Sequence, residues 1–159
     1  MDVRELYQDI ILDHGRHPRN FRALEHPSHV AQGHNPLCGD RVTVYLEIAG
    51  GRVKDVSFDG RGCAISTASA SLMTEILKDK TLAEADALFK GFHARVTGKP
   101  VPALAGDLAD DAERLEPLSG VAAYPTRVKC ATLAWHAFEA ALKTGAGKSV
   151  AQPATIKTE

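Results

Sequence analysis

The feature that most constrains the fold is a stretch of alternating apolar and polar residues at positions 42–48. Its apolar members are Val42, Val44, Leu46 and Ile48. A period of two places them on one face of a strand, so this strand is expected to be half-buried. Gly50-Gly51 follows and suits a tight hairpin turn, because glycine accepts positive φ angles. In the returning strand Val53 and Val56 are out of phase, which predicts a bulge between them.

Helical periodicity predicts helices before and after this hairpin. Residues 3–14 carry an apolar stripe at helical spacing, and Gly15 is expected to end that helix. A second helix is expected to begin after Cys63. Thr81-Leu82-Ala83-Glu84 has the pattern of a capping box and predicts a short third helix. Tyr124-Pro125 leads into a long last helix. The order of elements predicts an α+β fold, in which helices pack on one face of a small antiparallel sheet.

Two long segments are expected to be irregular. Residues 17–36 contain several histidines and prolines, and residues 97–118 combine helix breakers with acidic side chains. The second segment is expected to be an insertion loop with a helical turn or two. A chain of this length suits one domain, predicted over residues 1–145, with a flexible C-terminal tail at residues 146–159.

Charge and hydropathy exclude some classes of function. The 159 residues contain 19 Lys and Arg against 20 Asp and Glu, a net charge of −1. Nucleic-acid binding is therefore not expected, since it favours a basic excess. No apolar run approaches the roughly 20 residues of a membrane span. Acidic residues at the N-terminus stand where a secretion signal needs apolar ones. The expected location is cytoplasmic, with no membrane association.

The three cysteines are too few for a disulfide framework and lie at the boundaries of predicted elements. Cys38 precedes the first strand, Cys63 begins the second helix, and Cys130 lies near the start of the last helix. A helix N-terminus lowers the pKa of a thiol, since its free N–H groups favour the thiolate. This effect is expected at both helix positions. Thiolates bind zinc and attack sulfur.

The residues alone leave two interpretations of the cysteines open. Together with Asp40, three thiolates complete a tetrahedral zinc set. However, Cys38 and Cys63 are 25 residues apart, and Cys63 and Cys130 are 67 apart. These separations match no compact zinc finger, so three structural thiols remain an equal alternative. Asp40 by itself could equally be a turn or cap residue.

A family resemblance extends over nearly the whole chain. The motifs that carry it are Leu6-Tyr7, Ile11-Leu12-Asp13-His14, Pro18-Arg19-Asn20, Asn35-Pro36-x-Cys38-Gly39-Asp40, Gly60-x-Gly62-Cys63-x-Ile65-Ser66-x-Ala68-Ser69 and Lys129-Cys130-Ala131-x-Leu133. In these motifs the chain resembles the SufU/IscU family of iron–sulfur cluster assembly proteins, related to the NifU N-terminal domain. The resemblance implies a SufE/IscU-like fold. It also implies that Cys38, Asp40, Cys63 and Cys130 converge on one metal or cluster site.

Two features make the chain more similar to the SufU branch. Lys129 stands where IscU-type scaffolds have a histidine, and residues 97–118 resemble an insertion found in SufU-type proteins. SufU-type members bind zinc tightly and accept sulfur from a cysteine desulfurase. The resemblance therefore implies a Zn²⁺ cofactor and a sulfurtransferase that acts with a SufS-like desulfurase rather than as a free-standing enzyme. A downstream iron–sulfur scaffold would be the second partner.

The resemblance also implies roles for single residues. Cys38 would be the catalytic sulfur acceptor. Arg127 and Lys129 would offset the net −2 charge of zinc with three thiolates and a carboxylate, and Arg127 is a candidate contact for the desulfurase. The alternative function is an IscU-type scaffold that assembles a transient [2Fe–2S] cluster on the same thiolates.

The histidines have a metal-binding alternative of their own. Five of them fall within residues 14–34, which permits a second metal site, although loop and helix-end positions are the favoured interpretation. His136 is expected to pack or cap on the last helix.

Overall fold

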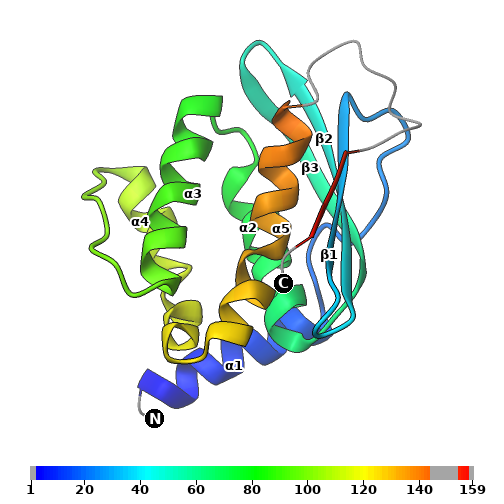
Figure 1. Cartoon of the computed structure of the whole chain (residues 1–159). Helices are drawn as coiled ribbons and strands as arrows, with labels where there is room; N and C mark the ends of the chain where they lie inside the picture. The colour runs from blue at the N-terminus through cyan, green and yellow to red at the C-terminus, as the bar shows by residue number, and fades with distance from the viewer. Residues whose placement is uncertain (1–2, 144–153, 158–159) are drawn as a thin grey trace.

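The computed structural model describes residues 3–143 and 154–157, and its centre is a four-stranded sheet in the order β3-β2-β1-β4. Strands β1 (His29–Asn35), β2 (Asp40–Ala49) and β3 (Arg52–Arg61) are antiparallel to one another. The short strand β4 (Ala154–Lys157) pairs parallel to β1. The helices gather on one side of this sheet (Figure 1). The predicted α+β class with a small antiparallel sheet is confirmed.

The described residues contain six helical segments. They are α1 (Val3–Arg16), α2 (Ala64–Leu77), α3 (Leu82–Val96), α4 (Asp107–Glu113), the 3-10 helix η1 (Glu116–Ala123) and α5 (Pro125–Lys143). Helix α5 contacts β1 and β2, and α2 contacts β3 and α5. Helix α3 packs against η1 and α5 on the side away from the sheet (Figure 1). Among the helices of the described residues, none is long and apolar enough to cross a bilayer.

The predicted hairpin is confirmed in detail. Gly50 and Gly51 have φ angles of 60° and 73°, which suit a tight turn that favours glycine. The register shifts between Glu47 and Ile48, so that Lys54 is left without a partner residue in β2 and forms the predicted bulge. The apolar side chains of β2 that alternate toward the helices are buried, and they are Val42, Val44 and Leu46.

The prediction that residues 17–36 form an irregular loop is wrong for their last part. Residues 29–35 form β1 and pair in continuous register with β2. The strand lacks a clear apolar alternation because helix α5 approaches it closely at Gly33. A Cβ atom at Gly33 would lie 2.9 Å from Leu133 Cδ1, so a larger side chain at this position would disturb the contact. Because Gly33 has no side chain, the apolar alternation that would predict a strand is interrupted there.

The ends of two helices also differ from expectation. Helix α1 continues through Gly15 to Arg16, since Gly15 does not adopt the positive φ of a helix-ending glycine. A Cβ atom at Gly15 would lie 3.3 Å from Ala64 Cβ, at the start of α2. The predicted capping box is confirmed, since the Glu84 N–H donates to Thr81 Oγ1 at 3.1 Å and the Thr81 N–H donates to Glu84 Oε1 at 3.0 Å. The helix that follows it, α3, is longer than expected and ends at Val96.

The segment predicted as an insertion is described in full, and the predicted tail only in part. Within residues 97–118 lie α4 and the first residues of η1, joined by irregular chain. Of the predicted tail at residues 146–159, the structure describes residues 154–157, which form β4. The rest of that segment lies outside the described residues.

Candidate metal centre

Cys38 lies on the turn between β1 and β2, and its side chain is exposed. Gly39 has a φ of 71°, a conformation that favours glycine, and it lets the chain bend directly after the cysteine. The turn is held by Asn35, whose Oδ1 accepts a hydrogen bond from the Leu37 N–H at 3.2 Å. Cys38 therefore lies in a short segment outside the regular elements, where a side chain can move at little cost.

Asp40 is the first residue of β2 and is fully buried. Its Oδ1 accepts a hydrogen bond from the Cys63 N–H at 3.0 Å. Gly62 makes room for this contact, because a Cβ atom there would lie 2.8 Å from Asp40 Oδ1. Among residues 3–143, no basic side chain forms an ion pair with this carboxylate.

Cys63 is the N-cap residue of α2, at the helix start that the sequence predicts. Its Sγ accepts a hydrogen bond from the Ser66 N–H at 3.4 Å. The same sulfur lies 4.0 Å from Asp40 Oδ2 and is half-buried.

Cys130 lies in the second turn of α5 and is fully buried. Its Sγ is 3.5 Å from Cys38 Sγ and 3.6 Å from the Thr126 carbonyl oxygen. Burial raises the pKa of the Cys130 thiol well above its usual range, and the neighbouring Cys38 and Asp40 act in the same direction. The expectation that a helix N-terminus lowers this pKa is wrong, because the residue lies inside the helix and away from water.

The structure brings three of the four expected ligands into one group. The ligand atoms of Cys38, Asp40 and Cys130 all lie within 4.8 Å of one another. Cys63 is outside that group but next to it, through its contact with Asp40. A buried carboxylate without a cation is costly, and thiols with one carboxylate are a donor set that zinc accepts. The residues present therefore fit a bound Zn²⁺.

Arg127 is the basic side chain that interacts with the thiols in the part of the chain that the structure describes. Arg127 is exposed, and the nearby thiols, Cys63 first and then Cys130, hold the pKa of its guanidinium above its usual range. Lys129 is half-buried and has no carboxylate within ion-pair distance in the part of the chain that the structure describes. The positive charge of Arg127 therefore interacts with the thiols.

One residue near the thiols received no role from the sequence. Asn35 is fully buried, and its Nδ2 lies 3.9 Å from Cys130 Sγ while its Oδ1 shapes the Cys38 turn. It thus connects both cysteines. Its position before Pro36 gave only the signal of an ordinary turn residue.

The histidines do not form a second cluster with three ligands. Within the described residues, the only group of three or more potential ligands is the one that contains Cys38. His14 is instead buried, with its Nδ1 2.7 Å from Ser71 Oγ. His136 packs edge-on against Phe89, with ring centroids 5.3 Å apart, which confirms the packing role predicted for it.

Comparison with known proteins identifies the family of the chain. The NifU-like N terminal domain family matches residues 6–131. The chain is 41% identical over 134 residues to the "Zinc-dependent sulfurtransferase SufU" of Bacillus subtilis (strain 168), which covers 84% of this chain and 87% of that protein. It is 37% identical over 144 residues to the "Iron-sulfur cluster assembly scaffold protein IscU" of Streptococcus pyogenes serotype M1, which covers 91% and 87%.

A solved structure shares the fold. It is that of a protein from Fervidobacterium islandicum AW-1, described as a candidate iron–sulfur cluster assembly scaffold for the SUF system. The TM-score is 0.73 at 33% identity, and the match covers 89% of this chain and 99% of that chain. The chain belongs to the NifU-like N-terminal domain family, the family of the iron–sulfur cluster assembly proteins SufU and IscU.

Proposed function

We propose that this chain is a zinc-dependent sulfur acceptor, in which Cys38 takes the outer sulfur of a persulfide carried by a cysteine desulfurase. The observation that carries this proposal is the position of Cys38. Its thiol is exposed on a turn and lies 3.5 Å from the buried thiol of Cys130. The name of the Bacillus subtilis relative supports the same function.

Cys38, Asp40, Cys63 and Cys130 are the residues that would hold the zinc ion. When bound, zinc would keep the thiols deprotonated, including the buried thiol of Cys130, whose pKa is otherwise raised. Arg127 would reduce the surplus negative charge of the donor set, because its guanidinium already lies near the thiols.

The transfer itself is a thiol–disulfide type of exchange. The Cys38 thiolate attacks the outer sulfur of the desulfurase persulfide, and a new S–S bond forms between Cys38 Sγ and that sulfur. The old S–S bond breaks, and the desulfurase cysteine leaves as a thiolate. The outer sulfur keeps its proton and its oxidation state, so no oxidant or reductant is consumed. The product is a persulfide on Cys38, ready for a downstream iron–sulfur scaffold.

Local structure favours Cys38 over the other two cysteines for this role. Cys63 caps α2 through its Sγ, so movement of its side chain would remove that cap. Cys130 is fully buried within α5. Cys38 lies on a turn and can reach a partner without loss of helix or strand hydrogen bonds.

The second candidate function is an IscU-type scaffold for a [2Fe–2S] cluster. The 37% identity with the Streptococcus pyogenes scaffold favours this function. Cysteine thiolates can bind iron–sulfur clusters and can also bind zinc. Lys129, next to Cys130, offers no ligand in place of a histidine, which favours zinc. Protein purified without air separates the two functions: a zinc sulfur acceptor is colourless with about one zinc per chain, whereas a cluster scaffold is brown.

A turnover assay tests the proposed function. A SufS-like desulfurase with free cysteine should release alanine faster when this chain is added, because persulfide removal frees the desulfurase for the next cycle. Cys38→Ser should abolish the increase. The control variant Leu37→Ser changes an exposed neighbour and leaves the Cys38 thiol in place, so it should keep most of the increase in alanine release. No stimulation by the parent chain, or equal stimulation by Cys38→Ser, would count against the proposal.

A further inference from the structure

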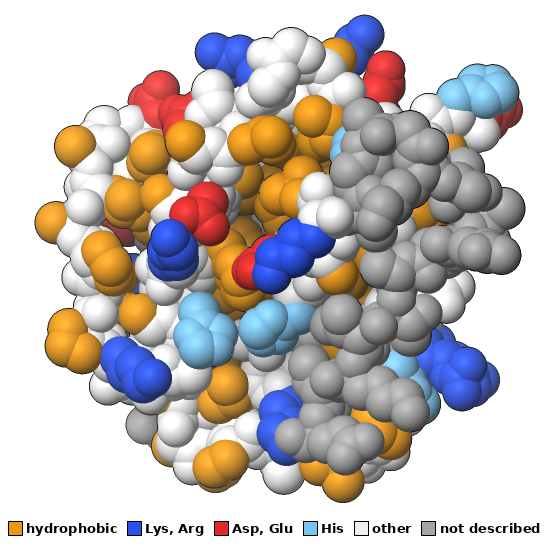
Figure 2. All heavy atoms as spheres, turned by 45° about the horizontal axis from the view of Figure 1, so that its top comes forward, with side chains coloured by type: hydrophobic (Ala, Val, Ile, Leu, Met, Phe, Trp, Pro, Cys, Tyr) orange, Lys and Arg blue, Asp and Glu red, His pale blue; other side chains and the backbone are white. Residues whose placement is uncertain are grey.

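A pocket of about 340 Å³ lies between α3 and α5. Its lining is formed by Phe89, Lys90, His93, Ala94, Lys99, His136 and Glu139. On the face drawn in Figure 2, two histidine side chains lie next to each other among hydrophobic and charged ones. The pocket combines an aromatic wall with a few nitrogen and oxygen atoms that can act as ligands, a lining typical of small-ligand sites.

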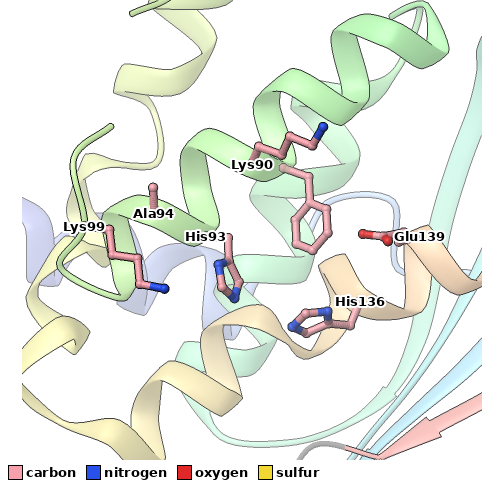
Figure 3. A pocket seen from close by; sticks show the side chains of 7 residues that line it. Lys90, His93, Ala94, Lys99, His136 and Glu139 are labelled. Carbon is pink, nitrogen blue, oxygen red and sulfur yellow. The ribbon is translucent and has the colours of Figure 1, made fainter. Parts of the chain in front are cut away.

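Two imidazole rings meet in this pocket from different helices. The ring centroids of His93 on α3 and His136 on α5 lie 5.9 Å apart, at an angle of 76°. Figure 3 shows the two rings pointing toward one another. Phe89 makes an edge contact with each ring, at 6.1 Å to His93 and 5.3 Å to His136. The phenyl ring therefore restricts the positions of both imidazoles.

The ring nitrogens of the two histidines are available as ligands. In the described residues 3–143, none of them has a hydrogen-bond partner in the protein, although both side chains are half-buried. Burial also lowers the pKa of His136, and the neighbouring His93 acts in the same direction. A neutral imidazole presents one nitrogen lone pair, which is the form that binds metals.

Glu139 adds a carboxylate to the same side of α5. It follows His136 by three residues, so the two side chains share one helix face. Its carboxylate is ion-paired with Lys143 at 3.0 Å, and its negative charge acts on His136. Of the two lysines in the lining, Lys90 is already paired with Asp86 at 2.9 Å. Only Lys99 adds a positive charge that no carboxylate of the described chain offsets.

We propose that His93 and His136 bind a divalent transition-metal ion between α3 and α5, with the carboxylate of Glu139 nearby to compensate its charge. Imidazole nitrogens suit zinc, copper, iron and nickel, and bind magnesium and calcium poorly. Cys130 lies about 9 Å earlier along α5, at 1.5 Å per residue, and contacts the Cys38 turn instead. The histidine site is therefore separate from the cysteine site and goes beyond the proposed sulfur transfer.

Nickel binding by the zinc-loaded full chain tests this proposal. Zinc and nickel are counted separately by elemental analysis after dialysis, and affinity is measured by calorimetry with Ni²⁺. The parent chain should bind about one nickel ion. Each of His93→Gln and His136→Gln should weaken nickel binding more than about tenfold. His26→Gln, a change at an exposed loop histidine, is the matched control and should bind as the parent does.

Two further measurements separate the outcomes. Nickel should raise the unfolding temperature of the parent, because the ion joins two helices, and should not raise that of the two histidine variants. The variants without nickel should unfold near the parent's temperature, which shows that they are folded. Cys63→Ser should retain nickel even if it loses zinc. A parent chain that binds no nickel, or nickel that persists in either His93→Gln or His136→Gln, would overturn the proposal.

Discussion

The Sγ atoms of Cys38 and Cys130 lie 3.5 Å apart, although 92 positions separate the two residues in the sequence. Helix α5 packs on β1, with Leu133 directly against Gly33. This packing places Cys130 near the end of β1, where the turn that contains Cys38 begins. One thiol of the pair is exposed and the other is buried. The pair thus joins a stable interior ligand to a group that can reach outward.

Gly62→Ala should damage the site through Asp40. The new Cβ would lie 2.8 Å from Asp40 Oδ1 and 3.1 Å from Ser66 Oγ, so the carboxylate must shift and its bond to the Cys63 N–H must weaken. We expect a loss of about 1–3 kcal/mol in the free energy of unfolding and weaker zinc retention. Urea unfolding and zinc analysis measure both effects.

Gly120→Ala is the control for that substitution. Nothing lies within 4 Å of a Cβ at Gly120, and its φ is not in the left-handed region. The control should leave zinc content unchanged. If Gly62→Ala behaved like Gly120→Ala in both measurements, the close approach of Gly62 to Asp40 would contribute neither to the free energy of unfolding nor to zinc retention.

Removal of zinc should destabilise the fold. The proposed ligands join the Cys38 turn, the start of β2, the start of α2 and the second turn of α5, so the metal links four parts of the chain. A chelator should lower the unfolding temperature, and added zinc should restore it. Cys63→Ser should bind less than one equivalent of zinc and respond less to the chelator. A full equivalent of zinc in that variant would remove Cys63 from the ligand set.

Stability of the chelator-treated protein should fall in mild acid, in part because of His14. Burial lowers the pKa of this side chain below its ordinary value of 6.5, and the Arg19 charge acts in the same direction. The unfolded chain therefore binds a proton more readily than the folded one. The contribution of His14 to the free energy of unfolding is fully present above pH 6.5. It is lost as the pH falls below that value, by up to about 1.4 kcal/mol per pH unit for one proton.

His14→Gln should reduce that slope, measured by urea unfolding between neutral and mildly acidic pH. His29 and His136 also have pKa values lowered by burial, so part of the slope should remain. His26→Gln changes an exposed loop residue and serves as the control. An unchanged slope in His14→Gln would show that the buried bond between His14 and Ser71 tolerates protonation.

The sequence predicts most of the fold where local signals are strong. The hairpin, its bulge, the capping box and the start of α2 follow from periodicity, glycine pairs and cap residues. Strand β1 could not be found in this way, because Gly33 is small to admit Leu133, a residue 100 positions away. Gly15 is likewise predicted to end a helix, because the sequence does not show that it packs against Ala64.

In the candidate site, too, local features could be predicted from the sequence and long-range contacts could not. Junction positions indicated that the cysteines were special, but their spacing could not bring Cys38 next to Cys130 without the family resemblance. The burial of Cys130, which raises its pKa, depends on how α5 packs and has no local signal. His93 and His136 are likewise brought together only by the packing of α3 on α5.

Persulfide mapping tests the central claim most directly. The chain is mixed with a SufS-like desulfurase and free cysteine, its thiols are alkylated, and each cysteine is examined by mass spectrometry. The account predicts that the added sulfur is found chiefly on Cys38 and that Cys38→Ser carries none, while it keeps its fold. Persulfide found chiefly on Cys63 or Cys130, or sulfur accepted at the parent's level by Cys38→Ser, would contradict it.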